Sequence, residues 1–143
     1  MDEIGVKLLR AGARLPQRAS AHASGFDLYA SLPDGSVEVR PEGVRIGTGI
    51  ALEVPPGLDA QSRPRSGLAS RGVISFLGTL DADYRGELFV TLRTLTPEIH
   101  HVVEDGDRIA QMVVTRLADV TFAPRDELPE TPRGGGGHGS TGR

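Results

Sequence analysis

The stretch that decides the fold is VRIGTGIALEV, residues 44–54. In an extended chain, one side of this segment would carry Val44, Ile46, Thr48, Ile50, Leu52 and Val54. The opposite side would carry Arg45, Gly47, Gly49, Ala51 and Glu53. A period of two sustained over this length predicts a β-strand with one face in the core.

Shorter alternations of the same kind occur on both sides of this strand. They are centred on Val37 and Val39, on 88–92 and on 113–117, and Gly, Pro or Asp residues bound each of them. No segment has the pattern of a long amphipathic helix. The 19 Gly and 10 Pro residues are scattered through most of the chain, which is typical of many short strands joined by turns. The sequence therefore predicts an all-β domain: a sandwich, jelly roll or small barrel.

Length and charge limit the possible functions. A chain of 143 residues predicts one domain with its own core. The net charge of −3 argues against direct binding to nucleic acid. The chain has no cysteine, which excludes disulfides and thiolate metal sites. No stretch has the length and composition of a signal peptide or membrane span, so we expect a cytoplasmic protein that does not enter membranes.

The composition changes at Pro129. Residues 129–143, PETPRGGGGHGSTGR, contain no large apolar residue that could anchor them in a core. We therefore divide the chain into a β-domain, residues 1–128, and a flexible C-terminal arm, residues 129–143. Composition alone favours a simple linker, but Arg133, Ser140 and Thr141 leave open an arm that closes over an anionic ligand.

Two motifs in the first half of the chain carry polar residues suited to a ligand site. In SGFDLYAS, residues 24–31, strand alternation directs Asp27 outward, as an ordinary surface aspartate would be. In RPRSGLASRG, residues 63–72, Arg65, Ser66 and Gly67 offer a guanidinium group, a hydroxyl and an open backbone, which together suit a phosphate. An ordinary turn explains the same residues.

Two further motifs follow in the second half. GTLDADYRGELFV, residues 78–90, places Asp81 and Asp83 on one face of an extended chain, followed by Tyr84 in a sequence that has few aromatic residues. A hairpin turn explains Asp83 but not the aromatic ring. GDRIAQMVV, residues 106–114, predicts a strand in which Gln111 is a polar residue within an apolar run. A buried, hydrogen-bonded glutamine is the alternative.

The order and spacing of these four motifs and the Gly-rich arm resemble the five motifs of the trimeric dUTPase family. The resemblance spans nearly the whole chain, from residue 24 to the arm. It implies a jelly-roll (β-clip) homotrimer whose three active sites lie at subunit interfaces. It also implies Mg²⁺-assisted hydrolysis of dUTP to dUMP and pyrophosphate, a reaction that limits uracil incorporation into DNA.

The resemblance also implies a role for each matching residue. Asp81 resembles the carboxylate that activates the water attacking the α-phosphorus, and Tyr84 resembles the ring under the deoxyribose. Gly78 and Leu80 would bind uracil through their backbone. The residues that would bind the phosphates are Arg65, Ser66, Gly67 and Gln111, together with the arm residues Arg133, Ser140 and Thr141. Asp27 would contact Mg²⁺ only through a water, because the ion is held chiefly by the phosphates.

Two positions depart from the family pattern. Ser75 stands where an asparagine commonly helps to read uracil, and His138 stands where a phenylalanine commonly stacks on the base. A hydroxyl is shorter and less versatile than an amide, and an imidazole can become charged near neutral pH. Both substitutions affect the recognition of the base rather than the hydrolytic step.

Two alternative functions remain open at this point. A dCTP deaminase shares the fold and the way the triphosphate is bound, but acts on the pyrimidine ring. A non-catalytic trimer that binds nucleotide as a regulator is the second alternative. Asp81, Tyr84 and the Gly-rich arm favour hydrolysis over both.

Overall fold

A computed structural model describes residues 2–137 of the chain. Its elements are β1 (Gly5–Leu8), β2 (Phe26–Tyr29), β3 (Val37–Val39), β4 (Val44–Glu53), β5 (Leu58–Arg63), α1 (Ser66–Ala69), β6 (Val73–Ser75), β7 (Gly78–Leu80), β8 (Glu87–Thr94), β9 (His101–Val103) and β10 (Arg108–Arg116). The prediction of an all-β domain is therefore confirmed. The RPRSG segment, residues 63–67, is not a simple turn: it begins with the last residue of β5 and ends with Ser66 and Gly67, the first two residues of the four-residue helix α1.

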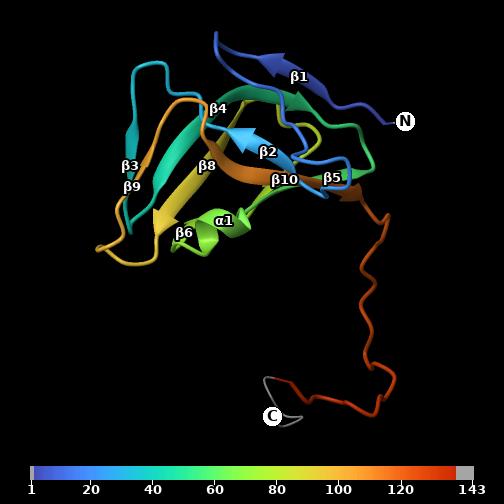
Figure 1. The fold of residues 1–143 in the computed structure, drawn as a ribbon. Helices are drawn as coiled ribbons and strands as arrows, with labels where there is room; N and C mark the ends of the chain where they lie inside the picture. The colour runs from blue at the N-terminus through green and yellow to red at the C-terminus, as the bar shows by residue number, and fades with distance from the viewer. Residues whose placement is uncertain (1, 138–143) are drawn as a thin grey trace.

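Two four-stranded antiparallel sheets make up most of the fold (Figure 1). One has the strand order β1-β4-β8-β6, the other has the order β2-β10-β5-β7, and β3 and β9 form a separate two-stranded sheet. The core contains small and branched apolar side chains from all three sheets, including Leu28, Ile50, Ala60, Leu92 and Val103. Burial of such side chains is the dominant favourable term in folding.

The segment that predicted the fold is strand β4, paired with β1 on one side and β8 on the other. The predicted inward face is correct, since Ile46, Thr48, Ile50 and Leu52 are all at most 3% exposed. The register against β8 shifts between Gly47 and Ala51. Such an irregularity bends a strand locally and redirects side chains.

The end of the described chain differs from the β-domain. After β10, residues 117–137 form no strand or helix and are almost entirely exposed, and Figure 1 shows them running away from the sheets. The predicted division at residue 128 stays a prediction. Within residues 2–137, no helix is long and apolar enough to cross a membrane.

Candidate active site

Asp27 is not the surface aspartate that strand alternation predicted. It is only 8% exposed, and its two carboxylate oxygens accept hydrogen bonds from two arginines. Arg65 Nε lies 3.0 Å from Oδ1, and Arg108 Nη1 lies 3.4 Å from Oδ2. Burial of a carboxylate is tolerated when the charge is paired in this way. The expectation failed because both partners lie far away in the sequence.

Gln111 lies beside this ion pair. In the sheet it stands opposite Asp27 on β2 and opposite Arg63 on β5, and its side-chain amide donates to the carbonyl of Pro64 at 2.9 Å. Gly25 leaves space for it, since a Cβ there would lie 3.0 Å from Gln111 Cδ. We call Asp27, Arg65, Arg108 and Gln111 the paired cluster.

Ser66 and Gly67 form the beginning of α1, directly after Arg65 of the paired cluster. Both residues are exposed, and a side chain added at Gly67 would meet no atom within 4 Å. The predicted phosphate-binding residues Arg65, Ser66, Gly67 and Gln111 are thus together at one end of the β2-β10-β5-β7 sheet. They leave an accessible backbone and hydroxyl beside fixed positive charge, which suits an anionic ligand.

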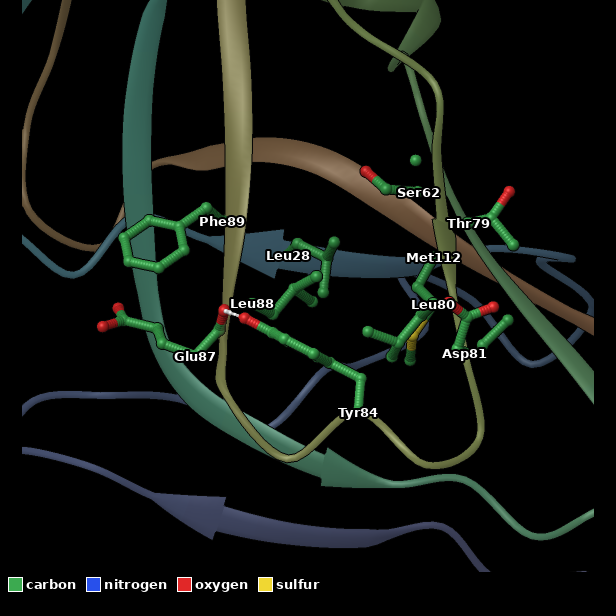
Figure 2. A pocket seen from close by; sticks show the side chains of 12 residues that line it. Leu28, Ser62, Thr79, Leu80, Asp81, Tyr84, Glu87, Leu88, Phe89 and Met112 are labelled. Carbon is green, nitrogen blue, oxygen red and sulfur yellow. Dashed lines mark hydrogen bonds between the residues drawn. The ribbon is translucent and has the colours of Figure 1, made fainter.

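The residues of the third motif surround a separate cavity of about 260 Å³ between β7 and β8. Figure 2 shows Leu80 and Asp81 on one side of it, Phe89 on the other, and Tyr84 lying across it. Its inner wall is apolar and includes Leu28, Leu88 and Met112. An apolar wall with a few polar groups at its rim is typical of a site for a small ligand. We call this space the hairpin cavity.

Tyr84 is held in place by its hydroxyl group, which donates to the carbonyl oxygen of Glu87 at 3.0 Å. The ring remains 44% exposed, so one face is available to a ligand. Asp81 is also exposed at the mouth of the cavity. The structure therefore places Gly78, Leu80, Asp81 and Tyr84 around a single space.

Asp81 of the hairpin cavity and Arg65 of the paired cluster are distant within one chain. Leu80 pairs with Ala60, so Asp81 lies near the beginning of β5, whereas Arg65 follows the end of β5. At about 3.3 Å per residue along the strand and about 4.8 Å between strands, the separation is on the order of 15–20 Å. We call the surroundings of the paired cluster and of the hairpin cavity the two half-sites.

Comparisons with known proteins identify the family of the chain. The family model described as dUTPase matches residues 11–142. The chain is 47% identical to the deoxyuridine 5'-triphosphate nucleotidohydrolase of Syntrophotalea carbinolica, over 97% of this chain and 96% of that protein. It is also 47% identical to the protein of the same name from Hydrogenobaculum sp., over 96% of both. The chain belongs to the dUTPase family.

Solved dUTPase structures have the same fold. The dUTPase of Staphylococcus bacteriophage 80alpha with dUPNHPP superimposes with a TM-score of 0.82, at 24% identity and over 100% of both chains. A mutant dUTPase from phage phi11 of S. aureus, described with a structural Mg(II) ion, gives a TM-score of 0.78 at 21% identity, over 89% of this chain and 99% of that one.

The position where dUTPases commonly have asparagine is occupied here by a buried serine. Ser75 is 4% exposed at the end of β6, opposite Leu92, and its hydroxyl has no hydrogen-bond partner within the described chain. It does not line the hairpin cavity. The predicted contact between Ser75 and a base stays a prediction.

Only one of the predicted arm residues lies in the described part of the chain. Arg133 is exposed, and its Nε donates to the carbonyl of Gly136 at 3.1 Å in a local turn. His138, Ser140 and Thr141 lie outside the described residues. Their predicted roles in base stacking and phosphate binding therefore stay predictions.

The described side chains were compared with the arrangements that hold metal ions in proteins. Within residues 2–137, no group of three or more His, Asp or Glu side chains is arranged to hold a metal ion. His100 is exposed, and neighbouring His101 is partly buried. Burial and the nearby charge of Arg71 lower the pKa of His101, although Asp107 opposes them. The lowered pKa favours the neutral form of this histidine.

Arg108 is a site residue to which the sequence assigned no role. It precedes the predicted strand in GDRIAQ, where an arginine is compatible with a solvent-exposed strand end. In the structure it shares Asp27 with Arg65, and its own carbonyl accepts from Arg65 at 3.3 Å. The only signal in the sequence was its place in the fourth motif.

Proposed function

We propose that this chain hydrolyses dUTP to dUMP and pyrophosphate. The observation that carries the proposal is the hairpin cavity, bounded by Asp81 and Tyr84 and set in a chain of the dUTPase family. A cavity of about 260 Å³ suits a nucleoside rather than a whole nucleotide. By removing dUTP, the reaction would limit uracil incorporation into DNA.

In this proposal the hairpin cavity binds the nucleoside. The backbone of Gly78 and Leu80 would pair with the edge of uracil, and His138 would complete recognition of the base. The deoxyribose would pack on the exposed face of Tyr84. A ribose 2'-hydroxyl would clash there or lose its hydrogen bonds to water, which disfavours UTP. A narrow slot would exclude the thymine methyl group by sterics.

The phosphates would bind to the half-site that contains the paired cluster. Arg65, Ser66, Gly67 and Gln111 would hold the phosphate chain, and Arg133, Ser140 and Thr141 of the arm would reach the γ-phosphate. The 15–20 Å separation estimated from strand geometry supports a site shared between subunits. We therefore propose a homotrimer in which neighbouring chains bring the two half-sites together and a third supplies the arm.

Asp81 would act as the base that takes a proton from the attacking water. A carboxylate in this role is exposed to the substrate side and needs only to lie within hydrogen-bond distance of that water. The attack would occur at the α-phosphorus, because the nucleoside end of the substrate lies next to Asp81. The pyrophosphate would then leave from the half-site containing the paired cluster.

Mg²⁺ fits this arrangement as a substrate-bound ion. The Asp27 carboxylate can accept about four hydrogen bonds, and the two arginines occupy two of these positions, so it can still accept from a metal-bound water. When bound, the ion would neutralise charge on the phosphates. The ion itself would be held mainly by phosphates and waters.

One assay separates this proposal from the two alternatives. Purified protein is incubated with dUTP, dCTP, dTTP or UTP, with and without Mg²⁺, and pyrophosphate and ammonia are measured together. We expect pyrophosphate to be released from dUTP but not from the other three nucleotides, at a rate that falls when Mg²⁺ is chelated. Ammonia release from dCTP would indicate a deaminase, and binding of dUTP without any product would indicate a regulator.

A further inference from the structure

The two glycines inside β4 leave space for an ion pair that crosses the β1-β4-β8 sheet. Arg10, just after β1, donates from Nη1 to Glu87 Oε2 at 3.2 Å and from Nη2 to Oε1. The Gly49 amide donates to the same Oε1 at 2.9 Å, and Arg10 Nε donates to Ser31 Oγ at 2.9 Å. Every side-chain nitrogen of Arg10 therefore has a partner.

The glycines are required by this ion pair. A Cβ at Gly47 would overlap the Glu87 carboxylate and lie 2.7 Å from Arg10 Nη2. Gly49 has a φ of +70°, which L side chains rarely adopt, and a Cβ there would lie 2.8 Å from Ser31 Oγ. The register shift between β4 and β8 occurs at these same residues. The strand is thus irregular where the ion pair lies.

The ion pair is largely removed from water. The Glu87 side chain is 17% exposed and the Arg10 side chain is 31% exposed. A bidentate arginine–carboxylate pair fixes the relative orientation of the two groups in addition to its electrostatic attraction. The amide of Gly49 adds a third hydrogen bond to the carboxylate, so the first residue of β8 is fixed to β4 and to the segment that follows β1.

Glu87 also connects this ion pair to the hairpin cavity. Figure 2 shows its carboxylate pointing away from the cavity, while its carbonyl oxygen accepts the hydroxyl of Tyr84. The ring reaches that carbonyl across Gly86, where a Cβ would overlap the Tyr84 hydroxyl. The Tyr84 hydroxyl is therefore bonded to the backbone of a residue that is fixed by its ion pair with Arg10 and by its pairing with Ala51 of β4.

We propose that Arg10 and Glu87 are positioning residues that set the selectivity for deoxyribose by fixing the carbonyl to which Tyr84 is anchored. The proposal rests on the proposed function, because the sugar is assumed to pack on Tyr84. Neither side chain touches the substrate. Their effect on selectivity must therefore pass through the Tyr84 hydroxyl, which makes the route testable by a double-mutant comparison.

The experiment compares Glu87→Gln, Arg10→Lys and Tyr84→Phe, and combines each of the first two with Tyr84→Phe. The kcat/KM values for dUTP and UTP are measured for every variant. Each single variant should lower the dUTP:UTP ratio by about fivefold, the factor expected for one hydrogen bond. The ratio in each double variant should equal that of Tyr84→Phe. Glu38→Gln, which removes an exposed carboxylate 3.8 Å from Arg40, is the matched control and should leave the ratio unchanged.

A merely structural ion pair gives a different result. It would lower the thermal midpoint and slow both nucleotides equally, so an unchanged ratio in folded Glu87→Gln and Arg10→Lys overturns the proposal. A further fall in the ratio on the Tyr84→Phe background overturns the route through Tyr84. If the Arg10 and Glu87 variants do not fold, the test rests on Tyr84→Phe. An unchanged dUTP:UTP ratio in that variant would show that the hydrogen bond of the Tyr84 hydroxyl does not affect selectivity, and would overturn the proposal.

A second measurement does not require activity. The chain has two tyrosines and no tryptophan, so Tyr29→Phe assigns the ring NMR signals of Tyr84. We expect those signals to shift in Glu87→Gln and Arg10→Lys but not in Glu38→Gln. Unchanged signals overturn the positioning role even if the protein hydrolyses dUTP. Shifted signals in a protein that does not hydrolyse dUTP would instead refute the proposed function.

Discussion

The paired cluster and the β7 side of the hairpin cavity lie on the same sheet, but the two places are prepared for a ligand in opposite ways. In the paired cluster, a buried Asp27 already holds two arginines in fixed positions. In the hairpin cavity, Asp81 is exposed and the Tyr84 ring presents an open face. Fixed charge lowers the cost of organising a phosphate site, whereas a base that receives a proton must remain accessible to water.

The largest predicted effect is the loss of turnover caused by a substitution at the hairpin cavity. Asp81→Asn keeps the shape of the proposed base and removes its charge, so turnover should fall on the order of 10²–10⁴-fold while binding of a non-hydrolysable dUTP analogue is kept. Rapid-quench assays would measure turnover, and calorimetry would measure binding of the analogue. Asp83→Asn, two residues along and also exposed, is the matched control. Near-normal turnover in Asp81→Asn would remove this residue from the mechanism.

A truncation tests whether neighbouring chains complete the half-sites. Deletion of residues 133–143 should lower turnover on the order of 10²-fold, because a loosely held substrate loses its reactive geometry. The thermal midpoint should hardly change, since the described part of this segment packs against no core residue. Mixing the truncation with full-length Asp81→Asn should restore activity after subunit exchange. Verified exchange without restored activity contradicts a shared site.

Disrupting the paired cluster should cost stability as well as affinity. Arg65→Ala leaves a carboxylate that is 8% exposed with a single, longer contact to Arg108. We expect unfolding free energy to fall by roughly 1–3 kcal/mol and KM for dUTP to rise. Urea denaturation and steady-state assays measure the two. Arg63→Ala removes a neighbouring exposed arginine, and a loss as large as that of Arg65→Ala would contradict the special role of the buried pair.

The smallest predicted effect is a loss of folding stability at acid pH, caused by protonation of Glu87. Burial of Glu87 would raise its pKa, but the hydrogen bonds from Arg10 and Gly49 and the charges of Arg10 and Arg45 hold the pKa below the ordinary 4.5. The unfolded chain therefore takes up this proton first, and the stabilisation present above pH 4.5 is lost as pH falls through the folded pKa.

The comparison that reveals this contribution is between wild type and Glu87→Gln. Thermal midpoints measured from about pH 7 to pH 3 should fall less steeply below about pH 4.5 in the variant, because an amide does not titrate. At neutral pH the variant should be the less stable protein. Parallel curves over the acid range would show that the Glu87 charge contributes nothing to stability.

The sequence predicted those features that depend on neighbouring residues. The alternation of residues 44–54 placed the strand and its buried face correctly, because side chains two apart share a face of any strand. The resemblance to the dUTPase family implied that Gly78, Leu80, Asp81 and Tyr84 belong to one site, and all four line the hairpin cavity.

Features that depend on distant partners were not predictable. Asp27 is buried only because Arg65 and Arg108, 38 and 81 positions away, approach its carboxylate. Gly47 and Gly49 look like mere interruptions of the strand until Arg10 and Glu87 are placed across them. Periodicity contains no information about pairs of this kind, which form only when the sheet is assembled.

The central claim is that the nucleoside end of dUTP lies beside Asp81 while the distal phosphates lie at the paired cluster, so that water attacks the α-phosphorus. Hydrolysis in ¹⁸O-labelled water tests it most directly, with mass spectrometry of both products. We predict that the label is found in dUMP and that pyrophosphate remains unlabelled. Label in pyrophosphate, with unlabelled dUMP, would contradict this placement of the substrate.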